Sequence, residues 1–348
     1  MSFLHKSVKS DKEVDMKQEL PNVHIIATGG TISGIGANRL DYTQYSDTGN
    51  RYTIEQLIGR IPEVQNIANL TYENLLATGS TNITPIDWLV IAERANTLLQ
   101  EGIDGIVITH GTATLEETAY FLNLTVKSNK PVVLTGAMRP PSSMSTDADI
   151  NLLDAIRIAS SKNASNMGVM GVLNNQIHSA REIIKMNTLR VDTFQSNDLG
   201  FLGFVDSDGQ VIFYRNSTKT HTYQSEFSTQ GLNQLPRVDI VVAYSGGDGL
   251  LIEAVKKNES QGLILAGFGS GTLPTVMKDS ALQLVKDGIP VVLASRSIMG
   301  RIVLTEKFRD EGFITCDNLS PQKARILLML SLLQTSDTQK IRDLFEKY

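Results

Sequence analysis

Short apolar runs rich in valine and isoleucine recur along this chain, and each ends in a loop of glycine, serine and threonine. Their apolarity is continuous rather than alternating, which is typical of parallel strands buried on both faces. Such runs occupy residues 23–27, 105–109, 132–136, 169–173, 238–244, 263–267 and 290–294. Segments with helical spacing follow most of them, which indicates an α/β protein with helices at 53–60, 85–101, 115–126, 150–160, 275–286 and 321–335.

The length of 348 residues exceeds the usual size of one hydrophobic core, so we expect about two domains. Residues 201–215 form two alternating segments around Asp208-Gly209, which predicts a β-hairpin, and the polar, aperiodic stretch after it marks the domain boundary. The sequence therefore predicts a large N-terminal α/β domain, with a mostly parallel sheet plus the hairpin, and a smaller C-terminal α/β domain with a parallel sheet. The boundaries are a disordered leader at 1–20, the N-terminal domain at 21–213, a linker at 214–235 and the C-terminal domain at 236–348.

Composition excludes several classes of function. The 32 basic and 37 acidic residues give a net charge of -5, so no basic surface suits nucleic acid or an anionic membrane. Cys316 is the single cysteine, and the five histidines lack the spacing of a zinc site, so we expect no metal. The first twenty residues contain no apolar run long enough for a signal peptide or a membrane span. As written, the chain is predicted to be cytoplasmic, or periplasmic or secreted if an export signal has been removed.

Three polar loops follow predicted strands, at residues 28–32, 109–114 and 269–272. Ligands of parallel α/β sheets bind at the carboxyl ends of the strands, where backbone N–H groups and helix N-termini converge. Glycine lets the backbone approach a ligand, and a threonine hydroxyl can act as a nucleophile when a base removes its proton. Each loop alone reads as an ordinary turn, but the three together favour a small-molecule site.

Nucleotide-binding and other hydrolase motifs fit poorly. Gly34-Ile35-Gly36 lacks the third glycine of a dinucleotide loop, and the chain has no phosphate-binding P-loop, no GxSxG elbow and no HExxH. His110 directly follows a strand, and we assign it a structural role in shaping the loop. Residues 34–52 are polar and contain Tyr42, Tyr45 and Tyr52, which indicates a mobile loop that closes over a site, although a solvated loop with incidental tyrosines has the same composition.

From Pro21 to Tyr348, the sequence resembles the bacterial L-asparaginases, specifically the type II asparaginase/glutaminase branch. The motifs that carry the resemblance are ATGGTI at 27–32, ITHGT and TLEETAYFLNLTVKS within 108–128, KPVVLTGAMRP at 130–140 and LSPQKARILLML at 319–330. The resemblance implies hydrolysis of the side-chain amide of L-asparagine, and of L-glutamine as a side activity, without metal or organic cofactor. It also implies a homotetramer, a dimer of tight dimers with sites at subunit interfaces.

The resemblance also implies roles for individual residues. Thr31 looks like the primary nucleophile, and Thr112 with Lys185 looks like the second hydroxyl and its base. Tyr42 matches the lid tyrosine that assists Thr31, although an insertion nearby also admits Tyr45. Further substrate-binding positions of the family fall on Ser80, which holds the α-carboxylate, and on Thr81, Gly111, Ala113, Thr272 and Glu306.

Departures from the family pattern concentrate around the substrate. The family motif HGTDT is His110-Gly111-Thr112-Ala113-Thr114 here, so the aspartate that orients the lysine and contacts the substrate ammonium is missing. Thr81 replaces the more frequent glutamine, Thr272 ends a loop that differs from the family's GNGN, and Glu306 is the nearest candidate for a glutamate lent to the neighbouring subunit. Loss of an orienting carboxylate costs about 10⁴ in rate in another hydrolytic triad, so we expect activity reduced by roughly 10³ to 10⁴.

Three interpretations remain open at this point. The first is an asparaginase disabled by Ala113, and the survival of Thr31, Thr112 and Lys185 favours an introduced change over natural decay. The second is a catalytically silent homologue that binds an amino acid or a protein partner. The third is a related amidase that uses a different amide. The sequence predicts the first.

Overall fold

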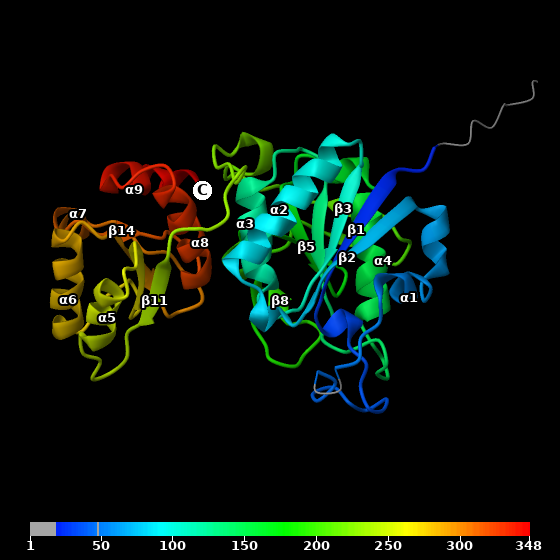
Figure 1. The fold of residues 1–348 in the computed structure, drawn as a ribbon, viewed down its shortest axis with the longest axis horizontal. Coiled ribbons are helices and arrows are strands. Elements are labelled where there is room, and N and C mark those ends of the chain that lie inside the picture. Colours follow the sequence, from blue (N-terminus) through cyan, green and yellow to red (C-terminus); the bar gives the residue numbers. More distant parts are fainter. Residues whose placement is uncertain (1–18, 47–48) are drawn as a thin grey trace, which may run out of the picture.

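A computed structural model describes residues 19–46 and 49–348. Nearly all of the leader predicted at 1–20 lies outside the described residues. The described chain forms an N-terminal and a C-terminal α/β domain that lie side by side (Figure 1). This is the fold class that the sequence predicts.

The N-terminal domain is built on an eight-stranded sheet with the order β10-β9-β6-β5-β4-β3-β1-β2. The strands from β2 to β5 in this order are parallel, and β6, β9 and β10 continue the sheet in antiparallel pairs. The hairpin expected around Asp208-Gly209 is formed by β9 and β10. The strand bounds are β1 Asn22–Gly29, β2 Asn69–Thr78, β3 Gly105–Thr109, β4 Val132–Thr135, β5 Val169–Leu173, β6 Gln176–Ser179, β9 Gly203–Val205 and β10 Val211–Phe213.

Helices cover both faces of this sheet, which explains the continuous apolarity of its central strands. On β1, Ile26 packs with α2 (Pro85–Gln100) and α3 (Leu115–Thr125), whereas Ile25 packs with α1 (Ile54–Ile58) and α4 (Ala148–Ala159) on the other side. Successive side chains of a strand point to opposite faces, so one strand supplies two cores. The helices thereby fix the direction of β1 and of the loop that follows it.

The C-terminal domain contains a parallel four-stranded sheet with the order β11-β12-β13-β14. Its helix α8 (Pro321–Leu332) has Ser320 as N-cap and Pro321 at its first position, which is where each residue type favours the start of a helix. This helix contacts both β12 and α3, so it joins the two domains. The other elements are β11 Val238–Val242, β12 Gly262–Gly267, β13 Val291–Ser295, β14 Ile314–Thr315, α5 Leu250–Lys257, α6 Thr275–Lys286, α7 Glu306–Asp310 and α9 Thr338–Lys347.

A short antiparallel pair, β7 (Ile184–Lys185) and β8 (Phe194–Gln195), lies apart from both sheets. It places Lys185 near the carboxyl ends of β1 and β3. No helix among the described residues is long and apolar enough to cross a membrane.

Candidate active site

Two glycine-threonine loops meet where β1 and β3 end. The strands are parallel neighbours, with Ala27 paired to Thr109, so their carboxyl ends lie together. Gly30 has a φ of +87°, and a Cβ atom on it would lie 2.2 Å from the Cα of Gly111. Only glycine permits this approach. It brings Thr31, which begins a 3-10 helix, beside Thr112.

Lys185 is positioned against the second of these threonines. Its Nζ lies 2.7 Å from Thr112 Oγ1, and its backbone N–H donates a 2.8 Å hydrogen bond to the carboxylate of Glu116 on α3. Burial lowers the pKa of Lys185 below its ordinary value, while the charge of Glu116 acts in the opposite direction. The lowered pKa increases the share of neutral amine, the form that can accept a proton from a hydroxyl.

Tyr45, rather than Tyr42, contacts the first threonine. The Tyr45 hydroxyl lies 2.7 Å from Thr31 Oγ1. The Tyr42 hydroxyl instead donates to the backbone oxygen of Met144 at 3.2 Å, and its ring lies under the Arg139 guanidinium. Of the two tyrosines that the resemblance allows, Tyr45 is therefore the one in hydrogen-bond contact with Thr31, while Tyr42 lines a neighbouring cavity together with Thr31 and Tyr45.

Ser80 lies opposite the threonines, in the 3-10 helix (Ser80–Asn82) that follows β2. Its Oγ accepts a 3.2 Å hydrogen bond from the backbone N–H of Ala113, and its carbonyl accepts one of 2.8 Å from the Thr114 hydroxyl. These bonds join the loop after β2 to the loop after β3. Ser80 is buried, and its hydroxyl faces the same cavity as both threonines.

His110 supports the loop from beneath and lies outside the cavity lining. Its Nε2 lies 2.9 Å from Thr118 Oγ1, which accepts a hydrogen bond from the Trp88 indole, and its Nδ1 lies 2.8 Å from the Gly111 carbonyl. This network assigns the proton to Nδ1 and leaves Nε2 as acceptor for the Thr118 hydroxyl. Complete burial lowers the pKa of His110 to about 4, so the ring is neutral. Its contacts fit the structural role that the sequence analysis assigns to it.

A cavity of about 280 Å³ lies between these loops. Among the expected site residues, Thr31, Ser80, Thr81, Gly111, Thr112, Ala113 and Lys185 line it. Arg51, which was not predicted as a site residue, also lines the cavity and directs Nη1 toward the Gly30 carbonyl at 3.5 Å. Arg51 lies in the segment expected to close over the site, but nothing in its spacing distinguished it from a surface arginine.

Arg51 marks the base of that closing segment. It pairs with Gly34 in an antiparallel bridge, and Tyr52 N–H donates to Ser33 O at 2.7 Å. The two ends of residues 34–52 are therefore held together beside Thr31, while the segment between them carries Tyr45 into the site.

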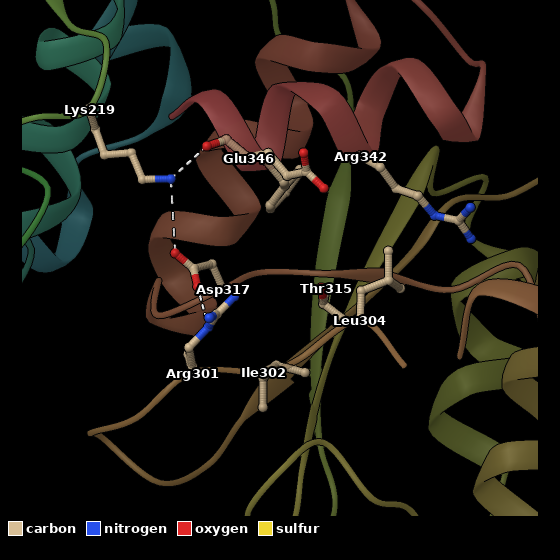
Figure 2. A pocket seen from close by; sticks show the side chains of 9 residues that line it. Lys219, Arg301, Ile302, Leu304, Thr315, Asp317, Arg342 and Glu346 are labelled. Atoms are coloured by element: carbon tan, nitrogen blue, oxygen red, sulfur yellow. Dashed lines mark hydrogen bonds and ion pairs between the residues drawn. The ribbon is translucent and has the colours of Figure 1, made fainter. Parts of the chain in front are cut away.

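A second polar hollow, of about 190 Å³, lies between the linker and the C-terminal domain (Figure 2). Lys219 donates to the backbone oxygen of Glu346 at 2.6 Å and lies 3.9 Å from Asp317, which also pairs with Arg301 at 3.0 Å (Figure 2). This second hollow has no lining residue in common with the cavity at Thr31. Within this hollow Asp317 pairs with both Lys219 and Arg301, and the contacts of Lys219 fasten the linker to the C-terminal domain.

Comparison with known proteins agrees with this geometry. The family described as Asparaginase, N-terminal matches residues 22–219, and the Glutaminase/Asparaginase C-terminal domain matches residues 237–345. The chain is 41% identical to L-asparaginase 2 of Bacillus subtilis, over 97% of this chain and 90% of that protein. The chain belongs to the asparaginase family.

Other members of the asparaginase family are similar to this chain in sequence and in structure. Identity is 37% to glutaminase-asparaginase of Pseudomonas fluorescens, over 97% of this chain and 93% of that protein. A crystal structure titled probable cytoplasmic L-asparaginase from Campylobacter jejuni superposes with a TM-score of 0.91 and 42% identity, covering 94% of this chain and all of that one. Family membership makes this chain an amidohydrolase.

The two asparaginase domains contribute unequally to the site within one chain. Every residue that lines the cavity belongs to the N-terminal match. Thr272 and Glu306 belong to the C-terminal match, are exposed, and line none of this cavity. Thr272 donates to Phe268 O at 3.2 Å, and Glu306 is the first residue of α7. Their placement at the site of a second subunit stays a prediction.

No group of three or more His, Cys, Asp or Glu side chains within residues 19–46 and 49–348 is arranged to hold a metal ion. The polar groups around the cavity include hydroxyls, the amine of Lys185, the guanidinium of Arg51 and the carboxamide of Asn50, whose donors suit an anionic organic ligand.

Proposed function

We propose that this chain hydrolyses the side-chain amide of L-asparagine to aspartate and ammonia, with L-glutamine as a poorer substrate. The observation that carries the proposal is the pair of hydroxyls at one cavity, Thr31 2.7 Å from Tyr45 and Thr112 2.7 Å from Lys185. A hydroxyl becomes a nucleophile when a neighbouring group accepts its proton. The names of the relatives, asparaginases and glutaminase-asparaginases, support the same reaction.

In the proposed reaction, Thr31 Oγ1 attacks the carboxamide carbon while Tyr45 takes part in moving its proton. The negative oxygen that develops is stabilised by backbone N–H groups of the loop after β3. The C–N bond then breaks, and ammonia leaves with the proton that the hydroxyl gave up. Thr112 and Lys185 form the second hydroxyl and base, and water hydrolyses the Thr31 ester to release the acid.

Substrate orientation is assigned to the opposite wall of the cavity. The Ser80 hydroxyl, with the Gly111 backbone, holds the α-carboxylate, and Thr81 and Ala113 lie at the position of the α-substituent. Ala113 offers a methyl group where the family motif has a carboxylate. We therefore propose that turnover of L-asparagine is lower by roughly 10³ to 10⁴ than with aspartate at this position.

A homotetramer, arranged as a dimer of dimers, is proposed for the assembled enzyme. Segments at or after the ends of β11, β12 and β13 expose large apolar side chains, namely Val242, Tyr244, Leu250, Leu251, Val276, Ile298 and Met299. Burial of such a group against another copy would also carry Thr272 and Glu306 toward a neighbouring site. Light scattering after size exclusion would show four times the 38.1 kDa chain mass, and a monomer would contradict the assembly.

The proposed location is the cytoplasm for the chain as written. Support comes from the Campylobacter jejuni relative, whose title includes the word cytoplasmic, whereas a Haemophilus influenzae relative is named as periplasmic. We also propose that the domain boundary falls within 214–235. Fractionation of the native cells, with ammonia release assayed in each fraction, would overturn the cytoplasmic location if the activity left with the periplasm.

The experiment that tests the proposed function is ammonia release from L-asparagine by this chain and by Ala113→Asp, prepared side by side. Ala113 is exposed to the cavity, so the larger side chain has room. Recovery of turnover in Ala113→Asp supports the proposal. Failure of both proteins to release ammonia from any amide would overturn it and favour a catalytically silent homologue.

A further inference from the structure

A buried cation that the proposed chemistry does not use is the ammonium group of Lys323. This lysine belongs to α8 of the C-terminal domain, the helix that contacts α3 of the N-terminal domain (Figure 1), and only 1% of its surface is exposed. Burial lowers its pKa to about 8, because an ammonium group is poorly stabilised away from water. An apolar side chain would pack here without that cost, so the value of Lys323 lies in what its Nζ contacts.

The Lys323 Nζ donates to two backbone carbonyls of the segment that leads to Lys185. The acceptors are Arg181 O at 3.0 Å and Ile183 O at 2.6 Å. Lys185 follows directly in β7, which pairs with β8 in a small sheet of its own. Buried carbonyls need hydrogen-bond partners, and here the partner is a side chain of the other domain rather than a neighbouring strand. The segment before Lys185 is therefore held by α8.

Glu116 on α3 is linked to both lysines. Its carboxylate accepts the backbone N–H of Lys185 at 2.8 Å. Burial lowers the pKa of both lysines, and the charge of Glu116 acts in the opposite direction on each. Burial raises the pKa of Glu116, and the charge of Lys323 opposes that rise. The other charged groups that face Lys323 are Glu117 on α3 and Arg181 and Glu182 before β7. This cluster joins α3, α8 and β7 outside the lining of the cavity.

We propose that Lys323 is a positioning residue for the amide hydrolysis, which holds Lys185 within hydrogen-bond distance of Thr112 through the carbonyls of residues 181 and 183. The inference rests on the proposed function, because it takes Lys185 as the base. Without the Lys323 ammonium both carbonyls lose a buried donor, and the segment shifts toward other partners. The distance from Lys185 Nζ to Thr112 Oγ1 is 2.7 Å, and a displacement of about 1 Å at a reacting group can cost about 100-fold in rate. The C-terminal domain thereby acts on the reaction of its own chain.

The test is Lys323→Met, made in the full unmodified chain and in the Ala113→Asp chain, with ammonia release from L-asparagine as the readout. Methionine fills a similar space but offers no hydrogen-bond donor. We expect kcat to fall by at least about tenfold while KM stays within about threefold, because the Ser80 hydroxyl assigned to the substrate carboxylate lies on another loop. Rates are referred to the folded fraction, which Trp88 fluorescence reports, so loss of folded protein does not enter kcat.

Hydrogen exchange gives a readout that does not depend on turnover. The backbone N–H of Lys185 is bonded to Glu116, and its protection reports how firmly the segment is held. We expect the peptide that spans residues 181–187 to exchange at least about tenfold faster in Lys323→Met than in the corresponding chain with Lys323. Exchange in the strands of the N-terminal sheet is expected to stay unchanged, which a general loss of stability would not allow.

A matched control separates the position of Lys323 from the loss of a lysine anchor as such. Lys130→Met is suitable, because the Lys130 Nζ also donates to two backbone carbonyls, Ile103 O at 2.5 Å and Leu99 O at 3.4 Å, and does not line the cavity. We expect its kcat to stay within about threefold of the chain with Lys130. Lys323→Gln keeps an N–H donor on α8 without the charge, so it carries the test if Lys323→Met does not fold.

Two results would overturn the inference and leave the proposed function intact. One is a kcat within about threefold of the chain with Lys323, in Lys323→Met or in Lys323→Gln where that variant takes its place. The other is a fall in kcat that Lys130→Met shows equally, or that leaves exchange at 181–187 unchanged. If no chain releases ammonia, Ala113→Asp included, the proposed function fails, and exchange at 181–187 alone decides whether Lys323 positions Lys185.

Discussion

The neutral state of His110, beneath the loop that carries Thr112, couples the stability of the fold to pH. The ordinary histidine pKa is 6.5, and burial lowers that of His110 to about 4 in the folded protein. The unfolded chain therefore binds a proton more readily, so acidification from pH 6.5 to about 4 progressively removes the stability that is present above pH 6.5. A pH of 5.0 lies about 1.5 units below the ordinary histidine pKa, so at this pH the free energy of unfolding has fallen by about 2 kcal/mol.

His110→Gln tests this value, since glutamine does not titrate. The variant loses stability at pH 7.5 because the bonds to Thr118 and Gly111 change, so the informative quantity is the difference between pH 7.5 and pH 5.0. We predict that this difference is about 2 kcal/mol smaller in the variant than in the unmodified chain. Histidines such as His178, whose pKa burial lowers to about 3, are present in both proteins and cancel.

Trp88 makes the assay specific to this region. It is the single tryptophan, it is buried, and its indole donates to Thr118 within the His110 network. Denaturant titrations followed by its fluorescence, at one protein concentration and at pH 7.5 and 5.0, give the change in the free energy of unfolding between the two pH values. The titrations are made for the unmodified chain and for the variant. An equal pH dependence in His110→Gln, and again in His110→Asn, would refute the assignment of a neutral, buried imidazole.

Further predictions concern the reactive groups. Tyr45→Phe lowers the kcat for L-asparagine by about 10² to 10⁴, whereas the kcat of Tyr42→Phe stays within a few fold of the unmodified chain. Equal losses of kcat in the two variants, measured by steady-state kinetics, would contradict a catalytic role of the 2.7 Å contact between Tyr45 and Thr31. Glu116→Gln removes a charge that raises the pKa of Lys185, so the rise of kcat with pH moves to lower pH; a shift to higher pH would show that Glu116 does not act on the amine. Gly30→Ala places a methyl 2.2 Å from Gly111 Cα and strains a φ of +87°, so we expect activity to fall at least about 100-fold with circular dichroism unchanged. Gly102→Ala is the control, because Gly102 also has a positive φ, of +105°, but has open space around it and does not line the cavity. Similar activities of the two variants would argue against contact of the two loops.

The sheet was predictable where burial on both faces leaves a continuous apolar run. The expected strands at 105–109 and 169–173 and the expected helix at 275–286 coincide with β3, β5 and α6. β2 was missed because it is a half-exposed edge strand with polar residues such as Glu73 and Asn74, so it lacks that signal. α9 was missed although Ile341, Leu344 and Phe345 carry helical spacing, because its other positions are strongly polar.

The site was predictable only in part. The strand-end rule led from residues alone to the loops of Thr31 and Thr112, because glycine and threonine stand where parallel strands end. Lys185 lies in a two-residue strand outside the main sheet, so only the family resemblance singled it out. The choice between Tyr42 and Tyr45, and the position of Arg51, depend on how a polar loop folds back, which no local pattern determines.

The most direct test of the central claim is ammonia release from L-asparagine by Ala113→Asp and by the double variant Ala113→Asp with Thr31→Ala. We predict that the single variant releases ammonia from L-asparagine and that the added Thr31→Ala lowers that rate by a factor of at least about 10³. Retention of the rate without the Thr31 hydroxyl would contradict the assignment of the nucleophile, and with it the site described at the ends of β1 and β3.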